Sequence, residues 1–104
     1  MNQVKIHTKK ELLNALSKNR EMIKLFGVTS LGIFGSFSKG EIKDSSDVDL
    51  LVSFDPAKKS FDNFMDLSFF LEGIFGRKVE IVTTQSLSKF IGPHILNEVQ
   101  NVSL

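Results

Sequence analysis

Residues 35–54 read GSFSKGEIKDSSDVDLLVSF, and this stretch decides which fold the chain can adopt. A Gly-Ser pair follows an apolar run, and ten residues separate the pair from Asp47-Val48-Asp49. From Asp47 onward, side chains alternate between the two faces of an extended chain. One face holds Asp47, Asp49, Leu51 and Ser53, and the other holds Val48, Leu50, Val52 and Phe54. The pattern predicts a strand over residues 47–54 with both carboxylates on one side.

The segments before this strand predict a helix, a strand and a loop. Thr8 and Glu11 have the spacing of a capping box that opens a helix, and Gly27 is its expected end. Residues 28–34 are apolar and β-prone, which predicts a strand. Residues 35–46 are rich in Gly, Ser and Lys, which is typical of a loop with room for one helical turn.

The segments after it alternate between helix and strand. Ser60 is the expected cap of a helix that ends at Phe75, and residues 78–83 predict a third strand. A last helix or helix pair is expected after Ser86, interrupted at Gly92-Pro93. This order indicates an α/β or α+β fold, a small mixed β-sheet flanked by helices, whose strand order the sequence leaves open.

Composition limits the classes of function. The 104 residues suit a single domain over positions 1–104, and a net charge of +1 gives no strong attraction to nucleic acid or to a membrane. The chain has no cysteine, so disulfides, thiolate zinc sites and cysteine nucleophiles are excluded. Residues 1–10 contain no apolar run of the secretory type, and we expect a cytoplasmic protein.

The two aspartates have chemistry suited to a cation. Carboxylates two residues apart on a strand can ligate one ion or a pair of ions, and magnesium prefers such oxygen ligands together with substrate phosphates. A bound cation would offset the cost of placing two unpaired carboxylates in an apolar strand. Taken alone, the pair fits a half-exposed strand with a solvated face about equally well.

The Gly-Ser pair indicates a phosphate-binding site only in combination with the residues near it. Glycine at the end of a strand permits close backbone approach, and free amides in such a turn bind anions. The Ser36 hydroxyl can add a hydrogen bond to a phosphate. Alone, Gly-Ser is usually only a turn, but beside Asp47 and Asp49 it could hold a nucleoside triphosphate with magnesium.

The stretch GSFSKGEIKDSSDVDLLV resembles the signature of the DNA polymerase β-like nucleotidyltransferase superfamily, which is Gly-Ser, a spacer of this length and Asp-x-Asp. The short chain and its helix-first order are most similar to the minimal nucleotidyltransferases, which are often antitoxins paired with HEPN-domain toxins. The resemblance implies the polymerase β-like nucleotidyltransferase fold. It also implies an enzyme that uses magnesium, with two ions expected, to transfer AMP from ATP to a hydroxyl of a HEPN toxin, expected to be a tyrosine, and so neutralises the toxin.

Carried over to this sequence, the signature assigns a role to each matching residue. Gly35 and Ser36 would hold the triphosphate. Asp47 and Asp49 would be catalytic metal ligands, with Asp49 the expected bridge between two ions. Glu80, in the predicted third strand, takes the third acidic position, where it would complete the metal site or deprotonate the attacking hydroxyl.

Two positions depart from the commoner pattern. Lys39 stands where the loop has more often an arginine, and lysine contacts phosphate as a point charge and not bidentately. Glu80 stands where aspartate is commoner, and its side chain is longer. Both departures leave open how active the site is.

Other polar residues have simpler interpretations. Lys43 could face phosphate, although a lysine in a polar loop is usually only solvated. Asp44 suits a turn or cap, and His7 an exposed terminal position. His94 follows Pro93 near a helix start, where a surface or capping role is the default and a ligand or base role the alternative.

The helix predicted over residues 60–75 is apolar around most of its circumference. Only a narrow polar strip near Asp62 and Asp66 interrupts this surface. Either the domain covers both sides of the helix, or some phenylalanines bind another chain and form a hetero-oligomer. The chain has no tyrosine, so a tyrosine acceptor would have to come from a partner. The apolar residues are Phe61, Phe64, Met65, Leu67, Phe69, Phe70, Leu71, Ile74 and Phe75.

Three hypotheses follow from the sequence. The first is a magnesium-dependent protein adenylyltransferase that acts as an antitoxin. The second is a catalytically weak or inactive binding module of the same fold that neutralises its partner by occlusion. The third is an unrelated small α/β domain with a solvated acidic strand. The nucleotide base, the partner and the stoichiometry are not determined by the sequence.

Overall fold

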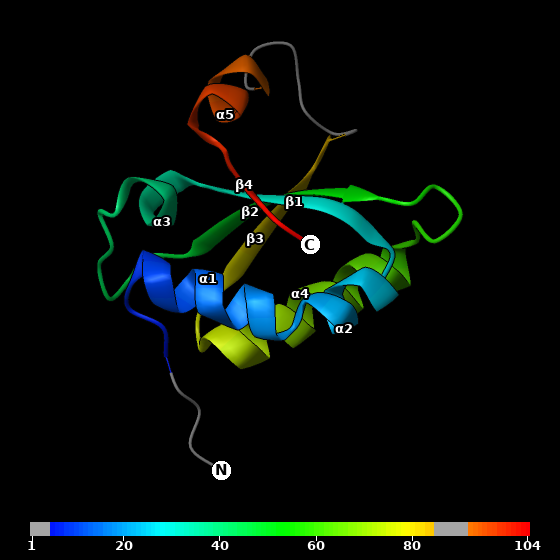
Figure 1. Cartoon of the computed structure of the whole chain (residues 1–104), viewed down its shortest axis with the longest axis horizontal. Coiled ribbons are helices and arrows are strands. Elements are labelled where there is room, and N and C mark those ends of the chain that lie inside the picture. Colours follow the sequence, from blue (N-terminus) through cyan, green and yellow to red (C-terminus); the bar gives the residue numbers. More distant parts are fainter. Residues whose placement is uncertain (1–4, 85–91) are drawn as a thin grey trace.

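The computed structural model describes residues 5–84 and 92–104, apart from the side chain of His94. Helices and strands alternate along the chain in an α+β order (Figure 1). The elements are α1 (Lys9–Lys18), α2 (Arg20–Leu25), β1 (Val28–Phe34), α3 (Gly35–Lys39), β2 (Val48–Phe54), α4 (Phe61–Phe75), β3 (Val79–Thr83), α5 (Gly92–Glu98) and β4 (Gln100–Val102).

The sheet has four strands in the order β3-β2-β1-β4. Strand β1 is antiparallel to both β2 and β4, whereas β2 is parallel to β3, so the sheet is mixed, as predicted. Helices α1, α2 and α4 cover one face, and α5 lies on the other side of the sheet (Figure 1). Within residues 5–84 and 92–104, no helix has the length and apolarity needed to cross a membrane.

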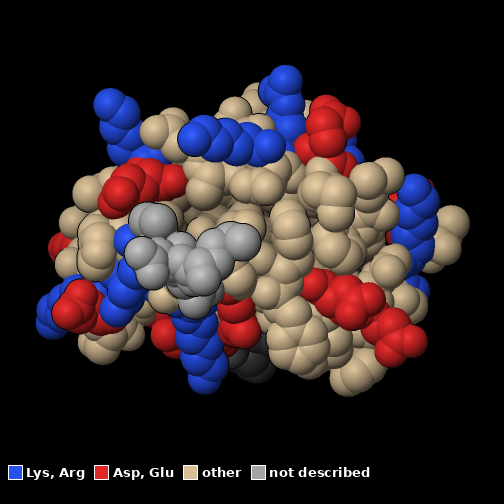
Figure 2. Space-filling model, turned by 90° about the horizontal axis from the view of Figure 1, so that it is seen from below, with Lys and Arg blue, Asp and Glu red and all other residues tan. Residues whose placement is uncertain are grey.

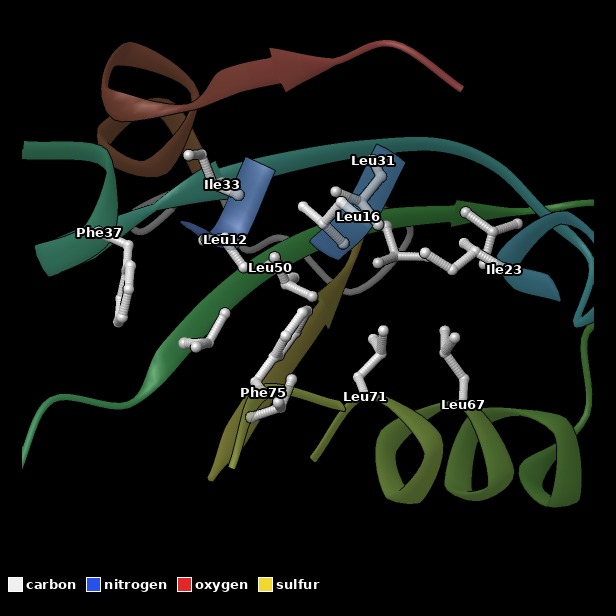
Figure 3. Close-up of a cluster of buried hydrophobic side chains, with 14 of the residues drawn as sticks. Leu12, Leu16, Ile23, Leu31, Ile33, Phe37, Leu50, Leu67, Leu71 and Phe75 are labelled. Atoms are coloured by element: carbon white, nitrogen blue, oxygen red, sulfur yellow. The ribbon is translucent and has the colours of Figure 1, made fainter. Parts of the chain in front are cut away.

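The core lies between the sheet and the layer formed by α1, α2 and α4 (Figure 3). Each of these elements presents an apolar face whose spacing follows its own period, 3.6 residues in the helices and 2 in the strands. Burial of this apolar surface is the main stabilising contribution to the fold. The fully buried side chains include Leu12, Leu16, Ile23, Ile33, Phe37, Leu50, Leu67, Leu71 and Phe75.

The two central strands and α4 lie where the sequence places them. Strand β1 matches the predicted residues 28–34, and β2 begins one residue later than predicted, at Val48. The inward face of β2 is buried at Val48, Leu50, Val52 and Phe54. Ser60 caps α4 by accepting a hydrogen bond from the Asn63 N–H at 3.1 Å, and Gly76 closes the helix with a φ of 64°.

The first helix is shorter than predicted and is followed by a second one. The helix expected to run as far as Gly27 breaks at Asn19, where φ is −110° and ψ is 13°. The Asn19 side-chain amide donates to the Ala15 carbonyl at 2.8 Å, which is the local bonding by which asparagine competes with a continuing helix. The break lets α1 and α2 bury Leu16 and Ile23 in one core.

The C-terminal region differs most from the prediction. Gly92 and Pro93 are the first two described residues of α5, and proline is favoured in the first turn of a helix, but whether they interrupt a longer helix depends on residues outside the described ranges. The part of the predicted last helix over residues 85–91 lies outside the described residues. Strand β4, which pairs with the edge of β1, was not predicted, because three residues are too few for a recognisable pattern.

Candidate active site

Three residues meet in one row across the sheet. In the register of the strands, Phe34 at the end of β1 is the partner of Asp49 in β2, and Asp49 is in turn the partner of Glu80 in β3. Asp47 immediately precedes β2. The three predicted acids therefore lie on neighbouring strands at one edge of the sheet, directly beside the Gly-Ser turn.

The Gly-Ser turn contacts the central carboxylate of the row. Gly35 has a φ of +70°, and a Cβ built at this position would overlap the Asp49 carboxylate. Only glycine satisfies both the left-handed conformation and this close approach. Ser36 follows in the first turn of α3 and is partly buried. In the folded chain, the backbone of the Gly-Ser turn therefore contacts the Asp49 side chain of the next strand.

The charges in this row act on one another. Burial, the neighbouring charges of Glu80 and Asp47 and a hydrogen bond with Glu80 raise the pKa of Asp49 from 3.8 to about 6. All of these causes disfavour the ionised carboxylate. A carboxylate with a raised pKa beside other acids is typical of functional sites.

The donor chemistry of this row fits magnesium. Asp47, Asp49 and Glu80 offer hard carboxylate oxygens, and a cation would relieve the charge repulsion that, after burial, contributes to the raised pKa of Asp49. Within residues 5–84 and 92–104, no group of three His, Cys, Asp or Glu side chains is ready to hold an ion as it stands. Glu80 is exposed and its side chain already contacts Asp49 through a hydrogen bond.

Lys39 is engaged elsewhere in this structure. Its Nζ lies 3.3 Å from Glu98 Oε1 at the end of α5, so it pairs with the C-terminal region and not with the acidic row. The Ser38 hydroxyl also donates to the Glu98 carbonyl, at 2.9 Å. These contacts tie α3 to α5. The predicted phosphate contact of Lys39 therefore requires the ion pair with Glu98 to open.

The weaker candidates have structural roles where they are described. Lys43 and Asp44 are exposed, and Asp44 Oδ1 lies 3.8 Å from Lys5 Nζ. His7 is exposed, as predicted, and its backbone N–H donates to Glu11 at 2.9 Å. His94 belongs to α5, but its side chain is outside the described part of the chain.

One contributor to this region was not predicted. Arg77, at the start of the segment that leads into β3, is 6% exposed and donates to the carbonyls of Lys43, Asp44 and Ser46 in the loop before Asp47. A basic residue after a helix-ending glycine has no sequence pattern that distinguishes it from a solvated one. Only the contacts identify it.

Comparisons with known proteins agree with the geometry. Residues 9–102 match the model of the nucleotidyltransferase domain. The chain is 40% identical over 80 residues to the protein adenylyltransferase MntA of Thermococcus cleftensis, a match that covers 77% of this chain and 80% of the relative. A solved structure described as a candidate minimal nucleotidyltransferase superposes with a TM-score of 0.79 at 27% identity, covering 89% of this chain and 94% of the other.

Two solved toxin–antitoxin complexes have the same fold. One contains AMP-PNP and matches with a TM-score of 0.65 at 18% identity, covering 89% of this chain and 70% of that chain. The other is a complex of a tri-AMPylated HEPN toxin of Shewanella oneidensis and an MNT antitoxin. It matches with a TM-score of 0.63 at 17% identity, and the match covers 88% of this chain and 70% of that chain. At these identities the likeness establishes the fold alone. The family match over nearly the whole chain and the 40% identity establish more, namely that this chain belongs to the nucleotidyltransferase domain family and has the fold of a minimal nucleotidyltransferase.

Proposed function

We propose that this chain is an antitoxin enzyme that transfers AMP from ATP to a hydroxyl of a partner HEPN-domain toxin. The observation that carries the proposal is the row in which Gly35 touches Asp49 and Asp49 pairs with Glu80. The names of a relative and of a solved complex support it, since the first is a protein adenylyltransferase and the second holds an AMPylated HEPN toxin.

Each candidate site residue has a role in this proposal. Gly35 and Ser36 hold the triphosphate through backbone amides and the serine hydroxyl. Asp47, Asp49 and Glu80 would hold magnesium, with two ions expected, and the metal would supply charge neutralisation for the phosphates and the pyrophosphate leaving group. Lys39 contacts phosphate once the Glu98 ion pair opens, because a triphosphate carries more charge than one carboxylate.

The transfer itself is a single displacement at phosphorus. The acceptor oxygen forms a bond to the α-phosphorus of ATP, the bond from that phosphorus to the bridging oxygen breaks, and pyrophosphate leaves. Glu80 is the candidate base for the hydroxyl proton, since it is exposed and hydrogen-bonded to Asp49. The acceptor hydroxyl, proposed to be a tyrosine, comes from the partner because this chain has no tyrosine.

The partner surface in this proposal includes the outer side of α4. The fold covers much of this helix, but Phe61 and Phe69 remain 76% and 62% exposed, and Leu25 of α2 is 70% exposed. On the helix-covered face, charged side chains of both signs stand around uncharged residues (Figure 2). Exposed aromatic residues of this kind commonly mark protein interfaces.

The test is transfer of label from ATP labelled at the α-phosphate to a co-expressed HEPN toxin in the presence of magnesium. We expect label on the toxin and an added mass of one or more AMP groups. If no AMP is transferred although the chain, toxin, ATP and magnesium are all present and intact, the proposal is wrong. Phe69→Asp should weaken toxin binding while leaving AMP-PNP binding to the isolated chain unchanged.

A second function has one observation in its favour. Lys39 is paired with Glu98, and no three acids in the described ranges are grouped as a ready metal site. These features would also suit a binding module that neutralises its toxin by occlusion alone. In that case the Asp47→Ala, Asp49→Ala double variant would neutralise the toxin as well as the wild type does.

A further inference from the structure

Arg77 is a buried cation, whereas most other lysine and arginine side chains in the described part of the chain reach solvent. It follows Gly76, which closes α4, and precedes β3, and it is 6% exposed. Burial of a guanidinium is strongly unfavourable unless hydrogen bonds compensate it. The hydrogen bonds and packing contacts of Arg77 must therefore compensate the cost of burying its charge.

The hydrogen bonds described for Arg77 all end on backbone carbonyls. Its Nε donates to the Ile6 carbonyl at 2.6 Å. Its Nη1 donates to the carbonyls of Lys43, Asp44 and Ser46 at 3.0, 3.1 and 2.7 Å. The guanidinium carbon also lies 5.3 Å from the centre of the Phe37 ring, which is a cation–π contact.

These contacts join every segment that carries a candidate site residue. Phe37 lies next to Ser36 in α3, and Ser46 directly precedes Asp47. Arg77 itself lies three positions before Glu80, and the adjacent Lys78 carbonyl accepts from the Val48 N–H at 2.9 Å. One buried side chain thus stands between the phosphate turn, the loop before the Asp pair and the strand of the third acid.

The loop needs such support because it forms few bonds of its own. Ser46 N–H donates to the Lys43 carbonyl at 3.0 Å, and Lys43 N–H donates to the Ser46 hydroxyl at 2.9 Å, which makes a small turn. Lys5 Nζ adds a bond to the Asp44 carbonyl at 2.8 Å, but this contact is exposed to solvent. The bonds of Arg77 to the loop are part-buried and therefore less screened by solvent than this exposed contact.

We propose that Arg77 is a positioning residue that sets the loop over residues 43–46, and through it the placement of Asp47 relative to the turn at Ser36. The inference rests on the proposed nucleotidyl transfer for its functional consequence. Lysine cannot replace the residue, because an ammonium on a flexible stem cannot reproduce the planar fork that reaches several carbonyls at once. Supporting groups of this kind typically change metal affinity or activity by about 10- to 100-fold when replaced.

The test compares Arg77→Lys and Arg77→Met with Arg20→Met as the matched control. Arg20 is the only other arginine, and its ion pair with Glu21 is exposed at 4.0 Å. Hydrogen exchange of the metal-free chain should become faster at residues 43–48 in both Arg77 variants and stay unchanged in α4. Calorimetry with AMP-PNP and magnesium should give affinity about tenfold weaker for Arg77→Lys and wild-type affinity for Arg20→Met.

Unchanged exchange in the loop, or unchanged AMP-PNP affinity in a folded Arg77→Lys chain, would overturn the inference. If neither Arg77 variant folds, the wild-type chain supplies the measurement through the side-chain Nε–H resonances of its two arginines. The Arg77 resonance should shift when AMP-PNP and magnesium bind, and the Arg20 resonance should not. A silent Arg77 resonance at saturation contradicts the inference. Failure of the wild type to bind AMP-PNP would instead contradict the proposed function.

Discussion

The two ends of β2 carry the same alternation of side chains but meet opposite surroundings. At its first end, Asp49 lies between the Gly35 backbone and Glu80, and burial together with the charges of Glu80 and Asp47 raises the pKa of Asp49 to about 6. At its last end, Phe54 lines an apolar cavity of about 510 Å³ with Phe61 and Phe64. Acidic side chains lie together at the first end of β2, and apolar side chains lie together at its last end.

The two ends of β2 differ in whether their polar side chains are stabilised by the fold. The outward Ser53 at the apolar end shares a hydrogen bond with Thr84 at 3.0 Å, so a polar group there is satisfied. The acids at the first end instead repel one another, which costs stability. A fold that retains such a cost does so where a ligand or a reaction compensates it. The predictions below test this contrast.

The largest effect is expected at the acidic end. Asp49→Ala removes the acid that both Gly35 and Glu80 contact, and AMP transfer to the toxin should fall by at least about 10³-fold. Ser53→Ala, on the same face at the other end of the strand, should transfer at close to the wild-type rate. Transfer of α-labelled AMP measures both. Comparable losses in the two variants would remove the contrast between the ends.

Gly35→Ala should disturb the turn and the acid together. The left-handed φ of +70° and the overlap with Asp49 both oppose a Cβ, so the free energy of unfolding should fall by about 2 kcal/mol. Gly40→Ala is the matched control, with a φ of +76° and open space around it, and should cost about 1 kcal/mol. Denaturant titration compares the two. Equal costs would show that the contact with Asp49 is unimportant.

Asp49→Asn should stabilise the metal-free chain in a pH-dependent way. Because the folded pKa of Asp49 is raised, its favourable contribution is complete below pH 3.8 and is lost as the pH rises through about 6. The variant should therefore gain about 1 kcal/mol at about pH 8, a value reduced for solvent screening of a partly exposed group, and nothing at about pH 3.5. Thermal unfolding at both pH values tests this. A gain that is the same at both would contradict the assigned cause.

The smallest effect is expected at the rim of the apolar end. Phe61 is 76% exposed, so Phe61→Ser should change the free energy of unfolding by less than about 0.5 kcal/mol. Phe75→Ala, in the same helix but fully buried, should cost about 3–5 kcal/mol. Denaturant midpoints separate the two, and a large cost at Phe61 would mean that the cavity stabilises the isolated chain.

Local patterns predicted the elements that have strong local signals. The alternation in β2, the cap at Ser60 and the end of α4 at Phe75 each depend on residues close in sequence, and the structure has these features. The break at Asn19 was missed because the apolar spacing continues through it. Strand β4 was missed because its pairing with the edge of β1 decides it, and its own residues carry no pattern.

For the site, too, residues with a local sequence signal could be predicted, and residues defined by distant contacts could not. Gly35, Asp47, Asp49 and Glu80 were predicted as site residues from residue type and spacing, and the structure places them close together at one edge of the sheet. The position of Lys39 was not predictable, since its partner Glu98 is far away in sequence. Arg77 was not identified at all, because its partners are backbone carbonyls, which no residue pattern encodes.

The sequence alone determined that both aspartates face the same way, that a Gly-Ser pair follows the first strand and that an acid occurs in the third strand. Only the tertiary structure decided that Phe34, Asp49 and Glu80 share one row. The reason is that strand register depends on burying the inward face of β2 against the helices, and a slip of one residue would turn every side chain over. The raised pKa of Asp49 depends on that register in part, because burial within the fold is its largest cause and Glu80 of the neighbouring strand contributes beside Asp47.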